Sequence, residues 1–356
     1  AAPARVEAGQ PEERADYESA VVEQVLSDST EKDPAADNGY RGEQLLLVTV
    51  KSGDYQGQQM QVYNYVGPLY GGPLHAGDRA TILISSYSDG TVNATVYEFD
   101  RLIPLAIVVA LFIAAAVIVG GRTGAKSLVA LAVTLMCLFG VLLPALMKGA
   151  NTLLMTFIVC AYVAVVSLTI VGGVQKKSVC AMLGAVAGTA LALLFGLLAQ
   201  ALTRVDGLRI EDVEPLLQLR QTGTPIGLRG LLVGGIIISA LGAVMDVTMG
   251  IASSLAEVHA ANPQLSRREL FRSGMNIGRD MVGTMTNTLI LAFLGSGFTL
   301  ILYLYSLGLS FRQLMSSAYV SMEVVSGVAS SVGVILSIPL TALITAAVFT
   351  REKQQS

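Results

Sequence analysis

Residues 238–258 read ISALGAVMDVTMGIASSLAEV, an apolar run with an aspartate near its middle. A helix of about 20 such residues, rising 1.5 Å per residue, crosses the hydrocarbon core of a bilayer. Such an ionisable group usually marks an ion pathway or a charged partner, because inserting it costs about 2.5–3.5 kcal/mol. Helical steps from Asp246 meet only small residues, a stripe that predicts close helix packing and points the carboxylate into a bundle rather than at lipid. The stripe comprises Gly235, Ser239, Gly242, Gly250 and Ser253.

The next apolar segment, 273–293, reads SGMNIGRDMVGTMTNTLILAF and carries a second polar face. Asn276, Asp280, Thr284 and Asn287 follow one another at steps of four, four and three, so they share one side of a helix. If this helix runs antiparallel to the one before it, the face meets Asp246 at one depth. These oxygens suit a hard cation or a hydrogen-bonded proton.

Arg279 points elsewhere, beside the helix entrance, where it can pair with an acid or a lipid headgroup. The structural alternatives stay open at this point. Thr284 and Asn287 can serve as caps or as interhelical hydrogen bonds, and Arg279 with Asp280 can form an interfacial ion pair. Asp246 can cap a broken helix or pair with Arg279.

Glu323 belongs to a third stripe, in the stretch SSAYVSMEVVSGVASSVGV (316–334). Its serine content is too high for a helix that faces lipid, so we expect the segment to be enclosed by protein or to line water. Glu323 would be a second station for an ion, at some distance along the chain from Asp246.

Composition places these stretches in a polytopic membrane protein. Of 356 residues 53% are hydrophobic and 14% are charged, and the mean hydropathy is +0.62. About seven transmembrane helices are expected, and the last apolar segment is too long for one straight crossing. We expect that segment, interrupted by Gly327, Gly333 and Pro339, to break, re-enter or lie along the interface. The runs are 103–119, 128–147, 152–173, 179–202, 230–256, 282–305 and 313–350.

The first hundred residues are of a different kind. Residues 1–16 are rich in Ala, Pro and Glu and predict a flexible tail. Residues 17–100 contain five short alternating runs separated by turn residues, which favours a small OB-like β-barrel. Nucleic-acid binding is disfavoured, because this segment has few basic residues and the chain has a net charge of −3. Residues 101–356 form the helical transmembrane domain.

Lysine and arginine in the loops set the expected orientation. If the spans alternate, Arg122, Lys126, Lys176 and Lys177 fall on the same side as the basic C-terminus, which we place in the cytoplasm. The β-domain is then extracytoplasmic. Such a domain needs a signal upstream, and the opening AAPA is typical of a processed end, so we expect that a leader has been removed.

The blocks 238–258 and 273–295 resemble the YibE/F family of bacterial membrane proteins. The resemblance implies a polytopic protein of the bacterial plasma (inner) membrane with an extracytoplasmic β-rich domain, over essentially the whole chain. Members of the family generally begin with a hydrophobic segment, which this chain lacks. The resemblance implies no particular chemistry.

We therefore expect a transporter or channel for a small ion, with proton coupling as one version. Its pathway residues would be Asp246, Asp280, Asn287, Thr284, Glu323, Arg279, Asn276 and Ser253. The rival is a non-transporting assembly or sensor protein whose external β-domain binds a partner. We expect no enzyme and no cofactor, since HExxH and GxSxG motifs are absent. Whether a metal binds is left open. The expected partners are the lipid bilayer, a small ion or proton, and either further copies of the chain or a related membrane subunit.

Overall fold

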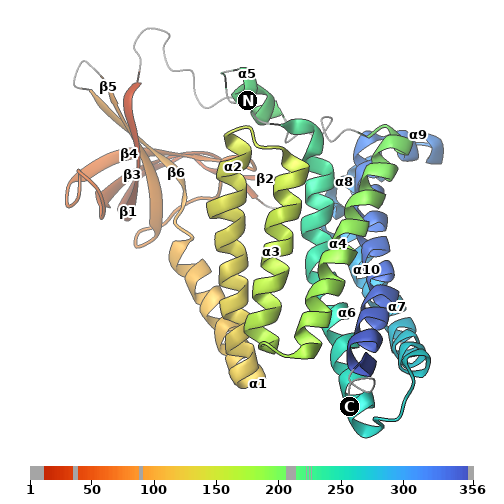
Figure 1. Cartoon of the computed structure of the whole chain (residues 1–356). Coiled ribbons are helices and arrows are strands. Elements are labelled where there is room, and N and C mark those ends of the chain that lie inside the picture. The colour runs from red at the N-terminus through yellow and green to blue at the C-terminus, as the bar shows by residue number, and fades with distance from the viewer. Residues whose placement is uncertain are drawn as a thin grey trace. The chain divides into compact units, whose positions relative to one another are not determined.

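The computed structural model of the chain describes residues 12–34, 39–87, 91–205, 214–221, 223, 225 and 227–351. Contacts divide the chain into two compact units, Ala1–Ala114 and Ala115–Ser356. The strands and the start of the first long helix build the first unit, and helices build the second (Figure 1). Each unit has its own hydrophobic core.

The strands of the first unit close into a barrel. The sheet has the order β1-β5-β6-β4-β3-β2, and β1 also pairs with β3, so five strands form a ring. The first part of β1 pairs with β5 and its second part with β3, while β4 and β6 are parallel neighbours. The bounds are β1 (Glu12–Asp28), β2 (Glu31–Asp33), β3 (Gly39–Val50), β4 (Gln59–Val66), β5 (Arg79–Tyr87) and β6 (Val92–Phe99).

A β-barrel-like N-terminal domain is thus confirmed, with two differences from expectation. The strand β1 begins at Glu12, so residues 12–16 lie in a strand rather than in the expected tail, and residues 1–11 lie outside the described residues. The short strand β2 was not expected, because its sequence EKD has no β-branched or aromatic side chain.

Strand alternation determines what fills the barrel. Leu46, Val48 and Val50 of β3 are fully buried, and the residues between them are partly exposed. Ile82 and Ile84 repeat this pattern on β5. Successive side chains point to opposite faces of a strand, so alternate positions form the core.

A polar network lies inside the barrel around Gln44, which is 1% exposed. Its amide donates to Asp28 Oδ2 at 2.9 Å, and its Oε1 accepts from Asn64 at 3.0 Å and from the Leu74 backbone N–H at 2.9 Å. Hydrogen bonds from Thr30 and from Gln44 hold the pKa of Asp28 below its usual value. The network joins β1, β3, β4 and the segment before β5.

The helices of the second unit follow the apolar runs. Their bounds are α1 (Leu102–Cys137), the π-helical turn η2 (Leu138–Leu142), α2 (Leu143–Met147), α3 (Thr152–Gly172), α4 (Lys176–Thr203), α5 (Glu214–Gln221), the 3-10 turn η4 (Leu228–Gly230), α6 (Leu231–Ala261), α7 (Arg267–Ser296), α8 (Phe298–Ser306), α9 (Phe311–Ser316) and α10 (Ala318–Arg351).

Among the described residues, five helices are long and apolar enough to cross a membrane, and a sixth crossing is possible if the bent pair α7 and α8 counts as one span. That pair is bent by 62° at Gly297. The longest apolar segment, Leu102–Met147, is itself interrupted at Gly121, whose φ of 55° and ψ of −134° are not helical. A Cβ on Gly124 would collide with the carbonyl oxygen of Ala116. In a straight helix, residues that are eight apart in the sequence are separated by about 12 Å along the axis. The contact between Gly124 and Ala116 therefore shows that the chain reverses its direction near Gly121.

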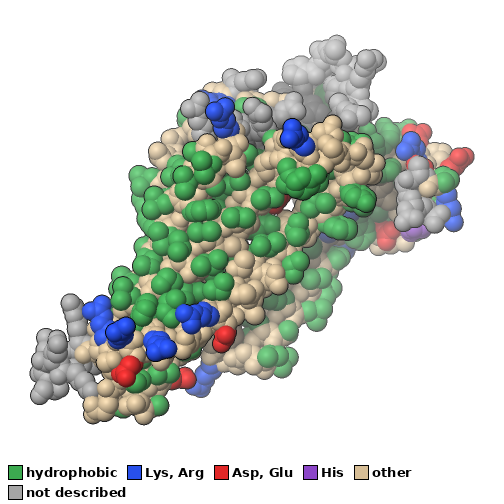
Figure 2. Space-filling model, turned by 90° about the vertical axis from the view of Figure 1, so that its right-hand side faces the viewer, with side chains coloured by type: hydrophobic (Ala, Val, Ile, Leu, Met, Phe, Trp, Pro, Cys, Tyr) green, Lys and Arg blue, Asp and Glu red, His purple; other side chains and the backbone are tan. Residues whose placement is uncertain are grey.

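Basic side chains of this unit are concentrated at the ends of its helices. The turn at Gly121, the α3–α4 and α6–α7 connections and the end of α10 all lie at the same end (Figure 1). On the face drawn in Figure 2, hydrophobic side chains dominate the middle, and Lys and Arg side chains gather toward the ends. This distribution is typical of helices that cross a bilayer. The basic residues at the turns include Arg122, Lys126, Lys176, Lys177, Arg267 and Arg268.

The core of the helical unit lies where α10 packs against α4, α6 and α7. Small residues let the backbones approach: a Cβ on Gly188 of α4 would lie 2.6 Å from the Cβ of Ser337 on α10. Buried hydroxyls turn back to their own helices, as where Thr341 donates to the Ser337 carbonyl at 2.8 Å. The serine-rich helix thus packs one side against α4, α6 and α7, while Val328, Leu336 and Leu343 are exposed.

The expected breaks at Gly327, Gly333 and Pro339 are wrong, because α10 runs through all three as one helix of 34 residues. The break falls earlier, at Ser317, which separates α9 from α10. Gly333 serves packing instead, since a Cβ there would lie 2.6 Å from the Cβ of Ala192 on α4. Neighbouring helices can hold a proline-containing membrane helix together.

Replacing Gln44 by alanine should lower the free energy of unfolding. The change leaves the Leu74 N–H without its acceptor, at about 1–3 kcal/mol for a buried unpaired group, and leaves the Asn64 amide only its longer hydrogen bond of 3.4 Å to the Gly72 carbonyl. Thermal unfolding followed by near-UV circular dichroism measures it. Gln61→Ala on the exposed side of β4 is the matched control, and equal melting temperatures for the two variants would contradict the assigned role of the network.

Replacing Gly188 by alanine should destabilise the helical unit. The new methyl would meet Ser337 at 2.6 Å and Val244 at 3.0 Å, and overpacking of this kind costs about 1–3 kcal/mol. Gly295→Ala in α7 is the control, because no atom lies within 4 Å of that Cβ position. Thermal unfolding in detergent should show a lower melting temperature for Gly188→Ala only; a lower value for both variants would count against close α4–α10 packing as the cause.

Candidate functional site

Asp246 lies at the middle of α6 and its side chain is exposed in the single chain. Among the described residues no hydrogen bond or ion pair reaches its carboxylate. Arg279, the cation considered for it, instead donates to Asn276 Oδ1 at 3.3 Å on its own helix. Asp246 is therefore a carboxylate at mid-helix whose charge nothing in the described chain compensates.

The expectation that Asp246 points into the bundle is wrong for the single chain. Beside it on the same side of α6, Gly235 and Gly242 have no atom within 4 Å of the position that a Cβ would take. The buried side of α6 is the opposite, apolar one, which includes Ile237 and Val244. Larger apolar side chains fill much of the contact with the other helices; of the stripe, Ser239 contacts α10 and Gly250 contacts α7, while Gly235, Gly242 and Asp246 are left exposed.

The polar residues of α7 are exposed as well. Asn276, Asp280, Thr284 and Asn287 are all open to the surroundings of the single chain. The packed side of this helix carries Gly274 and Gly278, which lie against Ala342 and Ile338 of α10. No ion pair joins Arg279 to Asp280 in the part of the chain that the structure describes.

Helix contacts set the register between α6 and α7. Leu255 lies against Gly274, Ile251 against Gly278, and Met281 against Gly250. The two helices are therefore antiparallel, and continuing the sequence of contacts puts Asp246 level with Thr284.

These residues also share a side. The helix α10 packs against both helices, through Ser330 to Ser239 at 3.0 Å and through Ile338 to Gly278. Ser239 is on the same side of α6 as Asp246, so α10 covers this side at the level of Ser239, whereas Asp246 and, on α7, Asp280 are exposed. We call this surface the open face: Gly235, Gly242, Asp246 and Ser253 of α6 with Asn276, Asp280, Thr284 and Asn287 of α7.

The hydroxyl oxygen of Thr284 can accept a hydrogen bond or bind a cation. Its hydroxyl donates to the carbonyl of Met281 at 3.1 Å, so the proton is engaged on the backbone and lone pairs stay available. The open face thus offers carboxylate, amide and hydroxyl oxygens over the middle of α7, from Asn276 to Asn287. Such oxygens can bind a cation or relay a proton.

Glu323 lies apart from the open face. It lines an apolar pocket of about 120 Å³ between the end of α7 and the start of α10, beside the bend at Gly297. The helices α6 and α10 run in the same direction with Ser239 against Ser330, and Asp246 and Glu323 each lie seven residues from that contact in opposite directions. The two carboxylates are therefore about 21 Å apart along the helix axes, at 1.5 Å per residue.

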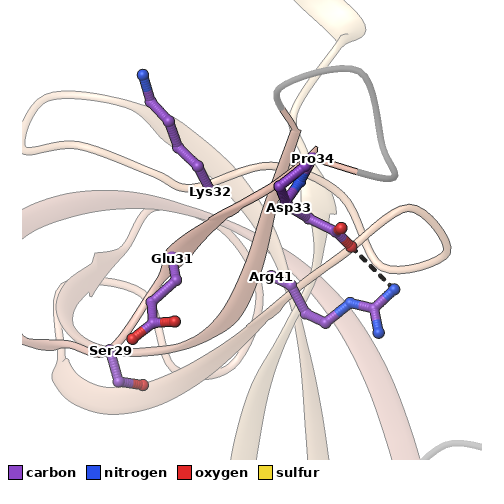
Figure 3. Close-up of a pocket in the computed structure, with 6 residues that line it drawn as sticks. All are labelled: Ser29, Glu31, Lys32, Asp33, Pro34 and Arg41. Carbon is purple, nitrogen blue, oxygen red and sulfur yellow. Dashed lines mark ion pairs between the residues drawn. The ribbon is translucent and has the colours of Figure 1, made fainter.

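The barrel has a surface pocket of about 290 Å³ at the β2–β3 hairpin (Figure 3). Its strongest interaction is internal, since Arg41 and Asp33 form an ion pair at 2.9 Å. Lys32 points away from the other labelled side chains (Figure 3). No group of three or more His, Cys, Asp or Glu side chains that could hold a metal occurs among the described residues.

Sequence reasoning missed a row of tyrosines on the barrel. Tyr17 and Tyr97 meet edge to face at 5.0 Å between ring centroids, and Tyr63 stacks on Tyr65 at 6.5 Å. All four are exposed, by 39–59%. The signal was present in the run VYNYV, where Tyr63 and Tyr65 occupy the outward positions between buried residues.

The model of the family described as YibE/F-like protein matches residues 108–351, so the chain belongs to that family. The match covers the helical part, and residues 1–107 lie outside it, so the expected resemblance is confirmed for the helical part and stays a prediction for the β-domain. No curated protein and no solved structure matches the chain.

Proposed function

We propose that this YibE/F-like protein is a transporter or channel for a small cation or a proton in the bacterial plasma membrane. Its ion pathway is lined by the open face of α6 and α7, with Asp246 as the principal ligand or proton carrier. The unpaired carboxylate at mid-helix carries this proposal. A charge at that depth costs about 2.5–3.5 kcal/mol on insertion, and no ion pair in the described chain offsets it.

The topology that fits this function has seven crossings. The segment Leu102–Met147 counts as two, because about 69 Å of helix at 1.5 Å per residue is twice the thickness of a hydrocarbon core. The shared end with the basic turns is then cytoplasmic. The barrel is extracytoplasmic and OB-like, since its five-stranded ring closes through β1.

The polar residues of the open face are arranged along the direction in which an ion would cross the membrane. From Asn276 to Asn287 they follow α7 for about 16 Å, at 1.5 Å per residue, from near the cytoplasmic turn to just beyond the level of Asp246. Beyond that level on the extracytoplasmic side, α6 contributes Gly242 and Gly235, which leave space. The bend at Gly297 interrupts the partner helix on that same side, as broken helices do in secondary transporters.

Asp246→Asn should strongly reduce flux without harming the fold. Purified protein in liposomes is assayed with an internal pH-sensitive dye for protons and with Na⁺ and Mg²⁺ tracers. Loss of one charged interaction of about 1.5–3 kcal/mol lowers flux about 10- to 100-fold. The melting temperature should stay near that of the wild type, because no hydrogen bond or ion pair within the described residues is lost.

Asp246→Glu is the matched control, because it keeps a carboxylate and should keep measurable flux. Asp280→Asn should reduce flux less than Asp246→Asn, since it lies nearer the cytoplasmic end. Unchanged flux in Asp246→Asn, or a loss that simply parallels a loss of folded protein, would favour a structural role for the aspartate.

The tyrosine row supports a second candidate function, in which the barrel binds an envelope glycan. Tyr17 of β1, Tyr97 of β6, and Tyr63 and Tyr65 of β4 offer exposed aromatic faces; β6 and β4 are neighbours, and Tyr17 meets Tyr97 across β5. Large rigid rings give contact area at little entropic cost, and OB-type barrels bind oligosaccharides. The strand register supports one continuous row, since Tyr63 pairs with Thr95, two residues from Tyr97.

Replacing Tyr63 and Tyr97 together by alanine in the full chain should weaken binding to isolated peptidoglycan about tenfold, by about 0.7 kcal/mol per ring. Co-sedimentation with cell-wall sacculi measures this. Leu69→Ala, an exposed apolar residue outside the row, is the control and should bind as the wild type does. Equal binding by all three proteins would remove the glycan proposal and leave the transport proposal untouched.

A further inference from the structure

The open face cannot lie against lipid tails. It presents the carboxylates of Asp246 and Asp280 and the amide of Asn287 within membrane-crossing helices. Hydrocarbon offers these groups no hydrogen bond, and intramembrane ionisable residues almost always face protein or water. The single chain therefore leaves uncovered a surface that the bilayer requires to be covered.

We propose that a second copy of this chain docks on the open face, so that two open faces meet around a two-fold axis and enclose the ion pathway between them. The docking argument rests on the exposed polar groups alone, whereas the claim that the enclosed space conducts ions rests on the proposed function. In a single chain, oxygens would reach the ion from one side of the pathway only, whereas in a dimer they would reach it from two opposite sides.

Symmetry favours a copy of the chain over an unrelated subunit. Two copies inserted in the same orientation are related by an axis along the membrane normal, which keeps every residue at its own depth. Asp246 and Thr284 of one copy then meet the same level of the other. Asn276 and Asn287 carry both donors and acceptors, so each amide can pair with the identical group, as an isologous interface requires.

The small residues of the open face fit the same arrangement. Gly235 and Gly242 on α6 and Gly283 on α7 have no atom within 4 Å of their Cβ positions, although other helical glycines of the chain, such as Gly188 and Gly278, are filled by neighbours. Small residues at helical spacing let two membrane helices approach closely. No helix of the described chain occupies the space beside these glycines.

Cysteine cross-linking tests the interface in protein reconstituted at high dilution in liposomes. In a background of Cys137→Ala, Cys160→Ala and Cys180→Ala, single cysteines are introduced on the open face at Gly242, Ser253 and Thr284. A disulfide needs Cα atoms within about 7 Å, so the positions nearest the axis should shift from 37.3 kDa to twice that mass on oxidation. Leu183→Cys and Leu343→Cys, exposed apolar positions on α4 and α10, are the controls and should stay monomeric.

Native mass spectrometry of the wild type in nanodiscs provides the second measurement and needs no cysteine replacement. The wild type should be a dimer, Gly242→Trp should shift to monomer, and Leu343→Trp should remain a dimer. A monomeric wild type, or cross-linking at the control positions in place of the open face, overturns the proposal. So does cross-linking in native membranes to a different protein.

The two proposals fail separately in these experiments. A dimer through the open face with no flux for any tested ion would end the transport proposal and leave the interface standing. Flux from a wild type that is monomeric in nanodiscs would end the interface proposal and leave transport standing.

Discussion

Hydrocarbon offers no hydrogen-bond partner, and this constraint explains the arrangement of the helical unit. Every backbone group in a crossing must be satisfied inside its own helix, which is why even the serine-rich stretch forms the continuous helix α10. Hydroxyls follow the same rule. Those of Thr189, Ser331 and Thr341 donate to carbonyls of their own helices at 2.7–2.8 Å, so they can be buried between helices at little cost.

Carboxylates and amides have no such local solution, because their side chains have too many hydrogen-bonding sites for one backbone carbonyl. In this chain Asp246, Asp280, Asn276 and Asn287 share the open face of α6 and α7, whereas Glu323 of α10 lies apart from it. The glycines of the two helices thus have two uses. Gly274 and Gly278 admit α10, whereas Gly235 and Gly242 leave room beside Asp246 for something outside the single chain.

The barrel solves the problem of polar burial differently. Its outer face carries charges and tyrosines, while the buried amides of Gln44 and Asn64 bond to each other inside and Gln44 also reaches the exposed carboxylate of Asp28. That network ties strands distant in sequence, which suits a small domain with a limited apolar core. The tyrosine row then stands out as an apolar feature on a surface that has no need of it for folding.

The sequence by itself determined the class of protein, the division into a β-domain and a helical domain, and the family, because hydropathy and alternation are local and record which surroundings each segment needs. It also placed four polar residues of α7 on one side, since helical spacing alone decides that. It could not decide which side of α6 faces the bundle, because a stripe of small residues and a stripe of larger apolar residues both favour packing. Contacts between helices decided this question. Ile237, Val244 and their neighbours form the packed core that α6 shares with α3, α4 and α10, and Asp246 is left exposed. The course of α10 through Gly327, Gly333 and Pro339 and the separation of Glu323 from Asp246 were decided in the same way, by contacts between helices that are far apart in the chain.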